Sequence, residues 1–188
     1  MKNGYTIYNP ETASEDAQVI LGQVQAHFQF IPNAMGAMVE SPLTAQSYMQ
    51  LTELAHQTSF SELEQHVIFL TISREYGCSY CVAAHTAFAQ MGRVEGETIQ
   101  SLREGKPLTD PKLRALQQFT QKMVQTGCNV SERDIEAILA HGYTRRNVLE
   151  LILLMTNKLV AVFSNRIMGT DLDDALAPAK WEQVSYAS

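Results

Sequence analysis

Apolar side chains recur at intervals of three and four residues along most of the chain, and charged or amide side chains fill the positions between them. The segment from Leu63 to Ile72 is an example, since Leu63, Val67 and Leu70 fall on one face of a helix with 3.6 residues per turn. No segment shows the sustained alternation of apolar and polar residues that is typical of a half-buried strand. The pattern therefore predicts an all-α protein.

Capping residues and glycines mark the expected helix boundaries. Ser41-Pro42 has the form of an N-cap followed by a first-turn proline, and Thr12-Ala-Ser-Glu15 and Ser61-Glu-Leu-Glu64 have the form of capping boxes. Phe30-Ile-Pro-Asn33 ends the first helix, and we expect an irregular, methionine-rich connector after it. The expected helices cover about 12–28, 42–56, 62–76, 78–91, 94–104, 111–126, 132–141 and 145–168.

The expected helices follow one another without a low-complexity linker, so we expect a single domain over residues 1–188. Within it we expect an N-terminal helical arm over about 1–40, a core over about 41–170 and an acidic tail over about 171–188 that forms a loop or an arm. A shift of 83 residues places Phe60-Ser61 on Tyr143-Thr144 and Cys81 on Ser164, with apolar segments matching between them. This internal match leaves open an origin from two related helical halves.

Composition and charge narrow the class of partner. The 188 residues are 45% hydrophobic and carry a net charge of −6, which gives no electrostatic reason to expect a nucleic acid or an anionic membrane as partner. The most apolar segment, Val148 to Phe163, is interrupted by Glu150, Asn157 and Lys158, and we expect a buried helix there and not a membrane span. The N-terminus lacks the apolar stretch of a signal peptide, and three cysteines without such a signal indicate a reducing compartment. We therefore expect a cytoplasmic protein.

Candidate chemistry is concentrated in Glu75-Tyr-Gly-Cys78-Ser-Tyr-Cys81-Val-Ala-Ala-His85. If one helix ends at Gly77 and the next begins at Cys78, both thiols lie in the first turn of the second helix, where free N–H groups and the helix dipole stabilise a thiolate. His85 follows Cys81 by four residues on the same helical face, so its imidazole can reach the sulfur or a substrate held above it. This is the arrangement of a redox dithiol with an acid–base partner.

Other interpretations of these residues stay open from the sequence. Cys78 and Cys81 could be packed small residues or two of four zinc ligands, although no second Cys-x-x-Cys accompanies them. His85 could be a structural histidine. His66 lies between two leucines at helical spacing and is expected to point inward, either as a buried histidine without a catalytic role or as a member of a proton relay. Cys128 is expected to be a lone structural thiol.

The stretch from Glu64 to His85, with its Cys-Ser-Tyr-Cys-Val-Ala-Ala-His end, resembles the AhpD-like alkylhydroperoxidases within the carboxymuconolactone decarboxylase superfamily. Phe30-Ile-Pro-Asn33, Ser41-Pro42 and the late helix around Asn157 to Asn165 are similar to the peroxidase-related branch, so the resemblance extends over most of the chain. It implies an AhpD-like helical bundle that assembles as a homo-oligomer, a dimer, trimer or hexamer.

The resemblance also implies roles for particular residues. By position, Cys81 matches the peroxidatic thiol of the family, Cys78 the resolving thiol and His85 the proton-relay histidine. The family places a glutamate twelve residues before the first cysteine, and this chain has His66 there. The nearest glutamate, Glu64, falls on a different helical face. Either His66 takes the place of the relay glutamate, or the enzyme works differently.

The implied function is a thiol-dependent peroxidase that reduces organic hydroperoxides or hydrogen peroxide through a dithiol–disulfide cycle. A dithiol reductant or reductase would restore the thiols, and no metal or organic cofactor is implied. Tyr80 departs from the better-known peroxidases, which carry a histidine between the two cysteines. Two alternatives remain, a decarboxylase-type enzyme that transforms a lactone and a non-catalytic, redox-responsive helical oligomer.

Overall fold

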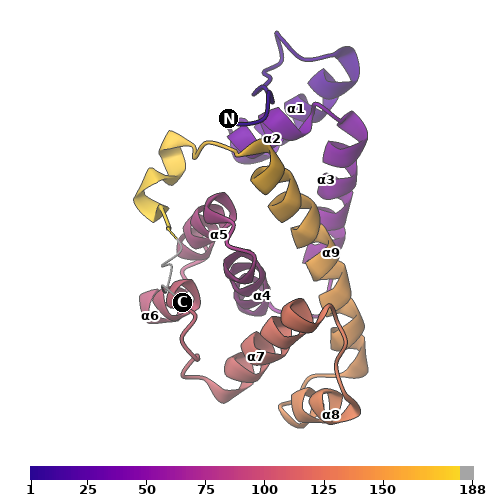
Figure 1. Ribbon diagram of the computed structural model, residues 1–188, viewed down its shortest axis with the longest axis vertical. Coiled ribbons are helices and arrows are strands. Elements are labelled where there is room, and N and C mark those ends of the chain that lie inside the picture. The colour runs from indigo at the N-terminus through magenta and orange to yellow at the C-terminus, as the bar shows by residue number, and fades with distance from the viewer. Residues whose placement is uncertain (183–188) are drawn as a thin grey trace.

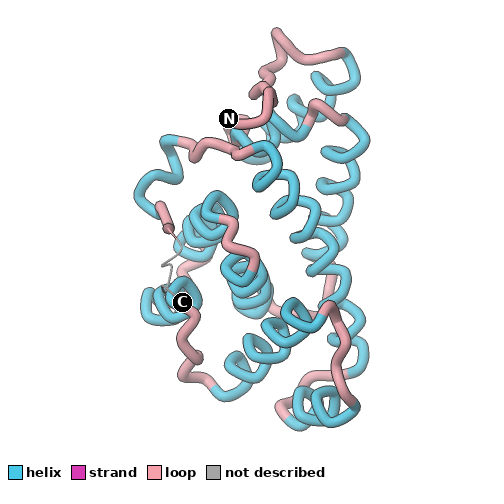
Figure 2. The backbone as a smooth tube through the Cα atoms, viewed as in Figure 1, coloured by secondary structure: helices cyan, strands magenta, loops and turns pink. Residues whose placement is uncertain are grey.

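The computed structural model describes residues 1–182, and every regular element in this part of the chain is a helix (Figures 1 and 2). This confirms the all-α prediction. The elements are α1 (Glu15–Phe28), α2 (Asn33–Met38), α3 (Pro42–His56), α4 (Glu62–Glu75), α5 (Ser79–Met91), α6 (Gly96–Glu104), α7 (Pro111–Thr126), α8 (Glu132–Ala140), α9 (Arg145–Met168) and the short 3₁₀ helix η1 (Asp174–Ala179).

Most helices begin where the capping residues predicted. The Ser61 hydroxyl accepts a hydrogen bond from the Glu64 amide, and the Glu64 carboxylate accepts one from the Ser61 amide at 2.8 Å, which is a complete capping box for α4. Thr144 and Asn147 pair in the same way at the start of α9. These reciprocal bonds satisfy amides that the first turn of a helix leaves free.

Two N-terminal predictions are wrong. The first helix begins at Glu15 after the N-cap Ser14, and Thr12 is not part of a capping box because its hydroxyl and amide are bonded to Asn9. The expected irregular connector is the short helix α2, whose first turn closes when the Pro32 carbonyl accepts from the amide of Met35 at 2.8 Å. Its small and methionine side chains are buried, so tertiary packing stabilises a helix that is too short to be stable alone.

The C-terminal segment packs on the body of the protein and is not a free loop or arm. η1 lies against α5, and the Arg103 guanidinium donates to the carbonyl oxygens of Ala179 and Lys180 at 2.9 and 2.8 Å. The Trp181 indole N–H donates in return to the Arg103 carbonyl. Figure 1 shows this segment beside α5 and α6. Residues 183–188 of the predicted tail lie outside the described residues.

The main core lies around α4, which packs against α5, α7 and α9. Every residue of α4 from Glu64 to Ser73 is buried, and the cluster around it includes Ile68, Leu116 and Leu154. A second, smaller core joins α1, α2 and α3. The long helices α3 and α9 run side by side (Figure 1). As a result, α9 crosses both cores and lies against α4 and the first turns of α5.

The internal match at a shift of 83 residues aligns two segments whose local structures differ, and an origin from two related halves stays a hypothesis. Gly77 lies between α4 and α5 with a φ of +63°, a conformation that favours glycine. The matching position, Val160, lies within the uninterrupted helix α9. The α4–α5 turn and the α9 segment therefore have different local structures.

By length and composition, α9 is the one helix of residues 1–182 that could cross a membrane. A core helix of similar composition would meet the same criterion. In this fold the inner face of α9 is buried: Leu151 and Leu154 lie in the main core around α4, and Val162 packs with Cys78 and Cys81, while part of the other face is exposed.

Candidate functional site

The two cysteines of the candidate dithiol are joined at the first turn of α5. Cys78 is the N-cap of the helix that follows Gly77, and Cys81 occupies its third helical position. The two residues form a disulfide with 5.2 Å between their Cα atoms, and the Cys81 amide donates to the Cys78 sulfur at 3.3 Å. Both side chains are buried. This confirms the predicted placement of both sulfurs at the beginning of a helix.

α9 contributes the hydrogen bond that reaches the Cys81 sulfur. The Asn165 side-chain N–H₂ group donates to Sγ of Cys81 at 3.5 Å, and the side-chain oxygen Oδ1 of Asn165 accepts from the Thr170 hydroxyl at 2.7 Å. Because Thr170 occupies the oxygen, the N–H₂ end of the amide is directed at the sulfur. A thiolate on Cys81 would keep this donor and would also lie at the N-terminus of α5, where the helix dipole stabilises negative charge.

His85 lies one turn after Cys81 in α5, in a part-buried position. Its Nε2 atom is 2.7 Å from Nζ of Lys158 in α9, and its ring packs between Phe69 and Phe88. Burial holds the pKa of His85 well below the usual histidine value, and the positive charge of Lys158 lowers this pKa further. The imidazole is therefore neutral at physiological pH. In the described residues its hydrogen bond is to Lys158, and none is present between His85 and either sulfur.

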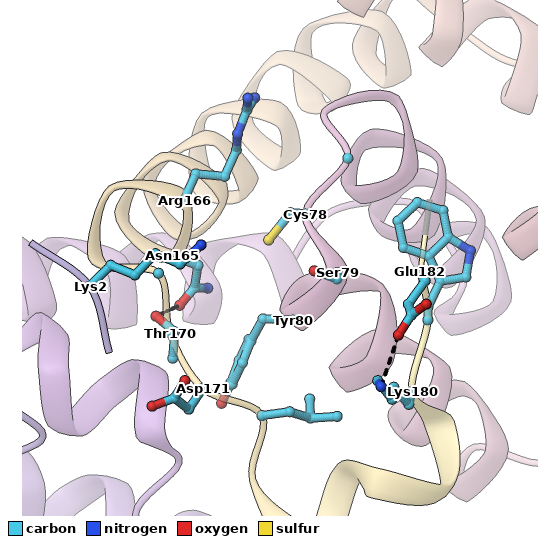
Figure 3. A pocket seen from close by; sticks show the side chains of 14 residues that line it. Lys2, Cys78, Ser79, Tyr80, Asn165, Arg166, Thr170, Asp171, Lys180 and Glu182 are labelled. Carbon is cyan, nitrogen blue, oxygen red and sulfur yellow. Dashed lines mark hydrogen bonds and ion pairs between the residues drawn. The ribbon is translucent and has the colours of Figure 1, made fainter. Parts of the chain in front are cut away.

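A cavity of about 440 Å³ opens beside Cys78, between the first turn of α5 and the end of α9. Figure 3 shows Cys78 across from Asn165 and Arg166 of α9, with the C-terminal segment forming the opposite wall. Charged side chains of both signs line it, and Lys180 forms an ion pair with Glu182 at 2.8 Å. A small molecule or an incoming thiol can approach the disulfide here from the Cys78 side.

No protein-family model matches the sequence, and no curated protein matches it. Solved structures do match. The alkylhydroperoxidase AhpD core, an uncharacterized peroxidase-related protein from Ralstonia eutropha JMP134, is 19% identical and has a TM-score of 0.81, covering 92% of this chain and 93% of that chain. An uncharacterized peroxidase-related protein from Silicibacter sp. TM1040 is 17% identical, with a TM-score of 0.76 and coverage of 93% and 92%.

A third similar structure is the debrominase Bmp8, with one cysteine changed to alanine, in complex with 2,3,4-tribromopyrrole. It is 15% identical, with a TM-score of 0.77, and the match covers 95% of this chain and 96% of that one. This chain has the AhpD-like fold. At these identities the likeness establishes the fold, and the function has to be argued from the site.

Within the AhpD-like fold, His66 lies in the second turn of α4, beside the C-terminal end of α5. Gly92 lies close to the His66 ring, since a Cβ atom added to this glycine would be 3.1 Å from Nε2 of His66. Oε1 of Glu62 is 3.9 Å from the same nitrogen. Burial lowers the pKa of His66, and Glu62 opposes this shift. Neither ring nitrogen has a hydrogen-bond partner in the described structure. The structure therefore buries His66 as predicted, and its role in a proton relay stays a prediction.

Glu64 has a structural role in this protein. Its carboxylate closes the capping box with Ser61 and forms an ion pair with Lys112 at 2.9 Å. It points toward α7 and the start of its own helix, and not toward the dithiol. The relay carboxylate that the sequence resemblance implies is therefore not supplied from this position.

Tyr80, between the two cysteines, ties three segments together. Its hydroxyl donates to the Asp173 carboxylate at 2.6 Å and accepts from the Ala34 amide at 3.3 Å, and the other Asp173 oxygen accepts from the Asn33 amide. Burial and the neighbouring Asp173 raise the pKa of Tyr80, so it remains a neutral phenol. Tyr80 thus positions the first turn of α5 against α2 and the C-terminal segment.

Metal-ligating side chains do not gather in groups of three or more within residues 1–182. Cys128 lies at the end of α7 as an exposed free thiol, remote from the bonded pair. Among residues 1–182, Cys78 and Cys81 are therefore not joined by the further ligands that a four-ligand structural zinc site requires.

Two functional candidates were missed by reasoning from the sequence. In the sequence, Lys158 only interrupts an apolar segment and Asn165 only belongs to the segment that resembles the family, but the structure places Lys158 against His85 and Asn165 against Cys81. They are seven residues apart, so they share one face of α9. Two buried polar residues at this spacing in an apolar helix were the available signal.

Proposed function

We propose that this AhpD-like protein is a thiol-dependent peroxidase of the alkylhydroperoxidase type. The observation that supports the proposal is the buried Cys78–Cys81 pair at the N-terminus of α5, with the Asn165 amide directed at the Cys81 sulfur. A pair in this position forms and breaks its disulfide without moving the backbone far, because the Cα atoms are already 5.2 Å apart.

In the proposed cycle, the Cys81 thiolate attacks the distal oxygen of a hydroperoxide. The S–O bond forms as the O–O bond breaks, which leaves a sulfenic acid on Cys81 and an alkoxide that takes up a proton to become the alcohol. The Cys78 thiol then displaces water from the sulfenic acid and forms the disulfide. A dithiol reductant attacks the disulfide and becomes oxidised as both thiols are restored. We propose that this reductant enters through the cavity beside Cys78.

The surrounding residues assist these steps by charge and hydrogen bonding. The helix N-terminus and Asn165 stabilise the attacking thiolate, since both present N–H groups to negative charge. His85 stays neutral, so its imidazole has one nitrogen that donates a hydrogen bond and one that accepts. We propose it as the acid–base group, as the position of His85 four residues after Cys81 suggests.

A second candidate is the reductive removal of bromide from a small aromatic ring. The likeness to the debrominase over 95% of this chain favours it, and a cavity of about 440 Å³ is large enough for a substituted five-membered ring. The net reaction would convert an aryl bromide and two thiols into an aryl hydrogen, a disulfide, bromide and a proton. It uses the same cysteine pair and needs the same reductant.

The two candidates are tested together on fully reduced protein. One equivalent of cumene hydroperoxide is expected to lower the number of free thiols per chain from three to one and to leave Cys128 reduced, with a Cys78–Cys81 disulfide seen by mass spectrometry. With excess dithiol reductant, peroxide consumption should continue over many turnovers. A parallel reaction with 2,3,4-tribromopyrrole measures bromide. Bromide release without peroxide turnover would reject the peroxidase, and oxidation without any turnover would favour a redox-responsive module.

We also propose that the protein is a homo-oligomer that associates through α9. Four apolar side chains lie on one stripe of this helix and are between 43% and 68% exposed: Leu149, Ile152, Phe163 and Ile167.

Light scattering of the wild-type protein should give a mass of at least twice the 21.0 kDa of one chain, and Ile152→Glu should lower this mass. Leu43→Glu, at an apolar position in α3 that is 77% exposed, is the matched control and should leave it unchanged. A wild-type mass of one chain would contradict the proposal.

A further inference from the structure

Lys158 is a buried lysine whose observed polar contact is a histidine. Lys158 as a whole is 2% exposed, and its Nζ atom lies 2.7 Å from Nε2 of His85. No ion pair between described residues includes Lys158. A buried ammonium without a carboxylate partner is costly to keep, so its retention beside a candidate acid–base group calls for a functional explanation.

The helices packed on α9 present no carboxylate to Lys158. On α4, Glu64 and Glu75 each form an ion pair with a cation elsewhere. On α3, Glu53 is exposed, and burial raises the pKa of Tyr48 so that it stays neutral. α2 has no ionisable side chain, and α5 contributes His85, Cys81 and Tyr80, whose hydroxyl is bonded to Asp173. Four further ionisable groups lie on α3 and α4. His56 is exposed, and Glu62 and His66 lie near each other. Arg74 is paired with Glu75.

We propose that Lys158 is a positioning residue that supplies a proton, through His85, to the oxygen that leaves when Cys81 cleaves a peroxide. This role rests on the peroxidase function proposed above. The Lys158 ammonium donates to Nε2 of the neutral imidazole, whose own proton then lies on Nδ1. As the O–O bond breaks, the departing alkoxide takes the Nδ1 proton while Nε2 takes one from Lys158. The products are the Cys81 sulfenic acid, an alcohol and a neutral amine, which water protonates again.

The electrostatics of the pair suit such a transfer. Burial lowers the pKa of Lys158 to about 7, so the amine can lose and regain a proton near neutral pH. The pKa of His85 is held well below its usual value by burial, by Lys158 and by His66, so the imidazole passes a proton on and does not retain it. Lys158 would thus do the work for which the sequence suggested His66.

The first test compares the rate of Cys81 oxidation by hydrogen peroxide in reduced wild type, Lys158→Met and Lys158→Arg from about pH 5.5 to about pH 9. The wild-type rate should fall above about pH 7 as Lys158 loses its proton, which gives the profile an alkaline limb. Lys158→Met should be slower by about 10²-fold at pH 6 and should lack this limb. Lys158→Arg should be about as slow, because a guanidinium keeps the charge but does not release its proton.

Full activity of Lys158→Arg would overturn the relay, since charge alone would then suffice. A wild-type profile in Lys158→Met would overturn it as well.

The second test does not depend on peroxide turnover. In ¹⁵N spectra of the imidazole side chains, His85 should carry its proton on Nδ1 at pH 6, and its Nε2 signal should shift as Lys158 titrates near pH 7. Lys158→Met should remove this shift. If the shift is absent in wild type, the relay is rejected while the peroxidase can stand. If the shift is present but wild type does not reduce peroxide, the proposed function is rejected and the relay with it.

Discussion

Replacing Cys81 with serine should reduce peroxide turnover to the uncatalysed background, a loss of roughly 10³-fold or more, because a serine hydroxyl is not ionised at neutral pH and is a far weaker nucleophile than a thiolate. The donors that stabilise the thiolate, the N-terminus of α5 and the Asn165 amide, remain in place in this variant but have no charge to stabilise. Peroxide consumption with excess dithiol reductant is the measurement.

Two further variants make this result specific. Cys78→Ser should still form a sulfenic acid on Cys81, which dimedone traps, but no intramolecular disulfide. Cys128→Ser is the matched control, because this thiol is exposed and free at the end of α7, and its turnover should equal that of wild type. If Cys81→Ser keeps turnover while Cys78→Ser loses it, the two thiols have the opposite roles from those proposed.

Replacing Lys158 with methionine should stabilise the protein by about 3 kcal/mol at about pH 6. Burial lowers the pKa of Lys158 to about 7, so below that pH the folded state holds a buried charge that the unfolded state exposes to water. A pKa shift of this size means that the buried charge of Lys158 lowers the free energy of unfolding by roughly 5 kcal/mol. Methionine removes this penalty, but about 2 kcal/mol of the gain is lost because Nε2 of His85 then has no hydrogen-bond donor. An unfolding temperature raised by about 6–12 °C is the expected result.

The increase in stability caused by Lys158→Met should depend on pH with a definite sign. Between about pH 7 and the ordinary lysine pKa, the unfolded state binds more protons than the folded state, so the contribution of Lys158 to stability rises with pH. The gain from Lys158→Met should therefore be largest at or below pH 7 and should shrink toward pH 10. Lys122→Met is the matched control, since this half-exposed lysine is paired with Asp134 on the surface and its removal should not stabilise the protein. A destabilised Lys158→Met at pH 6 would contradict a buried, uncompensated charge.

The helix boundaries that the sequence predicted correctly are those with a local cause. The capping box of Ser61 and Glu64 and the N-cap Thr144 act within four residues, so their hydrogen bonds need no distant partner. Thr12 failed as a cap for a local reason, its bonds to Asn9, but the other two wrong predictions depend on distant contacts. α2 is too short to be stable alone and is helical because its residues are buried, and the C-terminal segment is ordered by Arg103, which lies about 76 residues earlier in the chain.

The candidate site divides in the same way. The sequence by itself determined the dithiol and the position of His85 on the same face of α5, because the spacing of three and four residues in a helix sets both. Only the tertiary structure decided that Asn165 reaches Cys81, that Lys158 reaches His85 and that Glu64 turns away to Lys112. These contacts join residues 48 to 84 positions apart, and their formation depends on how α9 and α7 pack against α4 and α5. Helical periodicity fixes which residues share a face, but the packing of whole helices decides which faces meet.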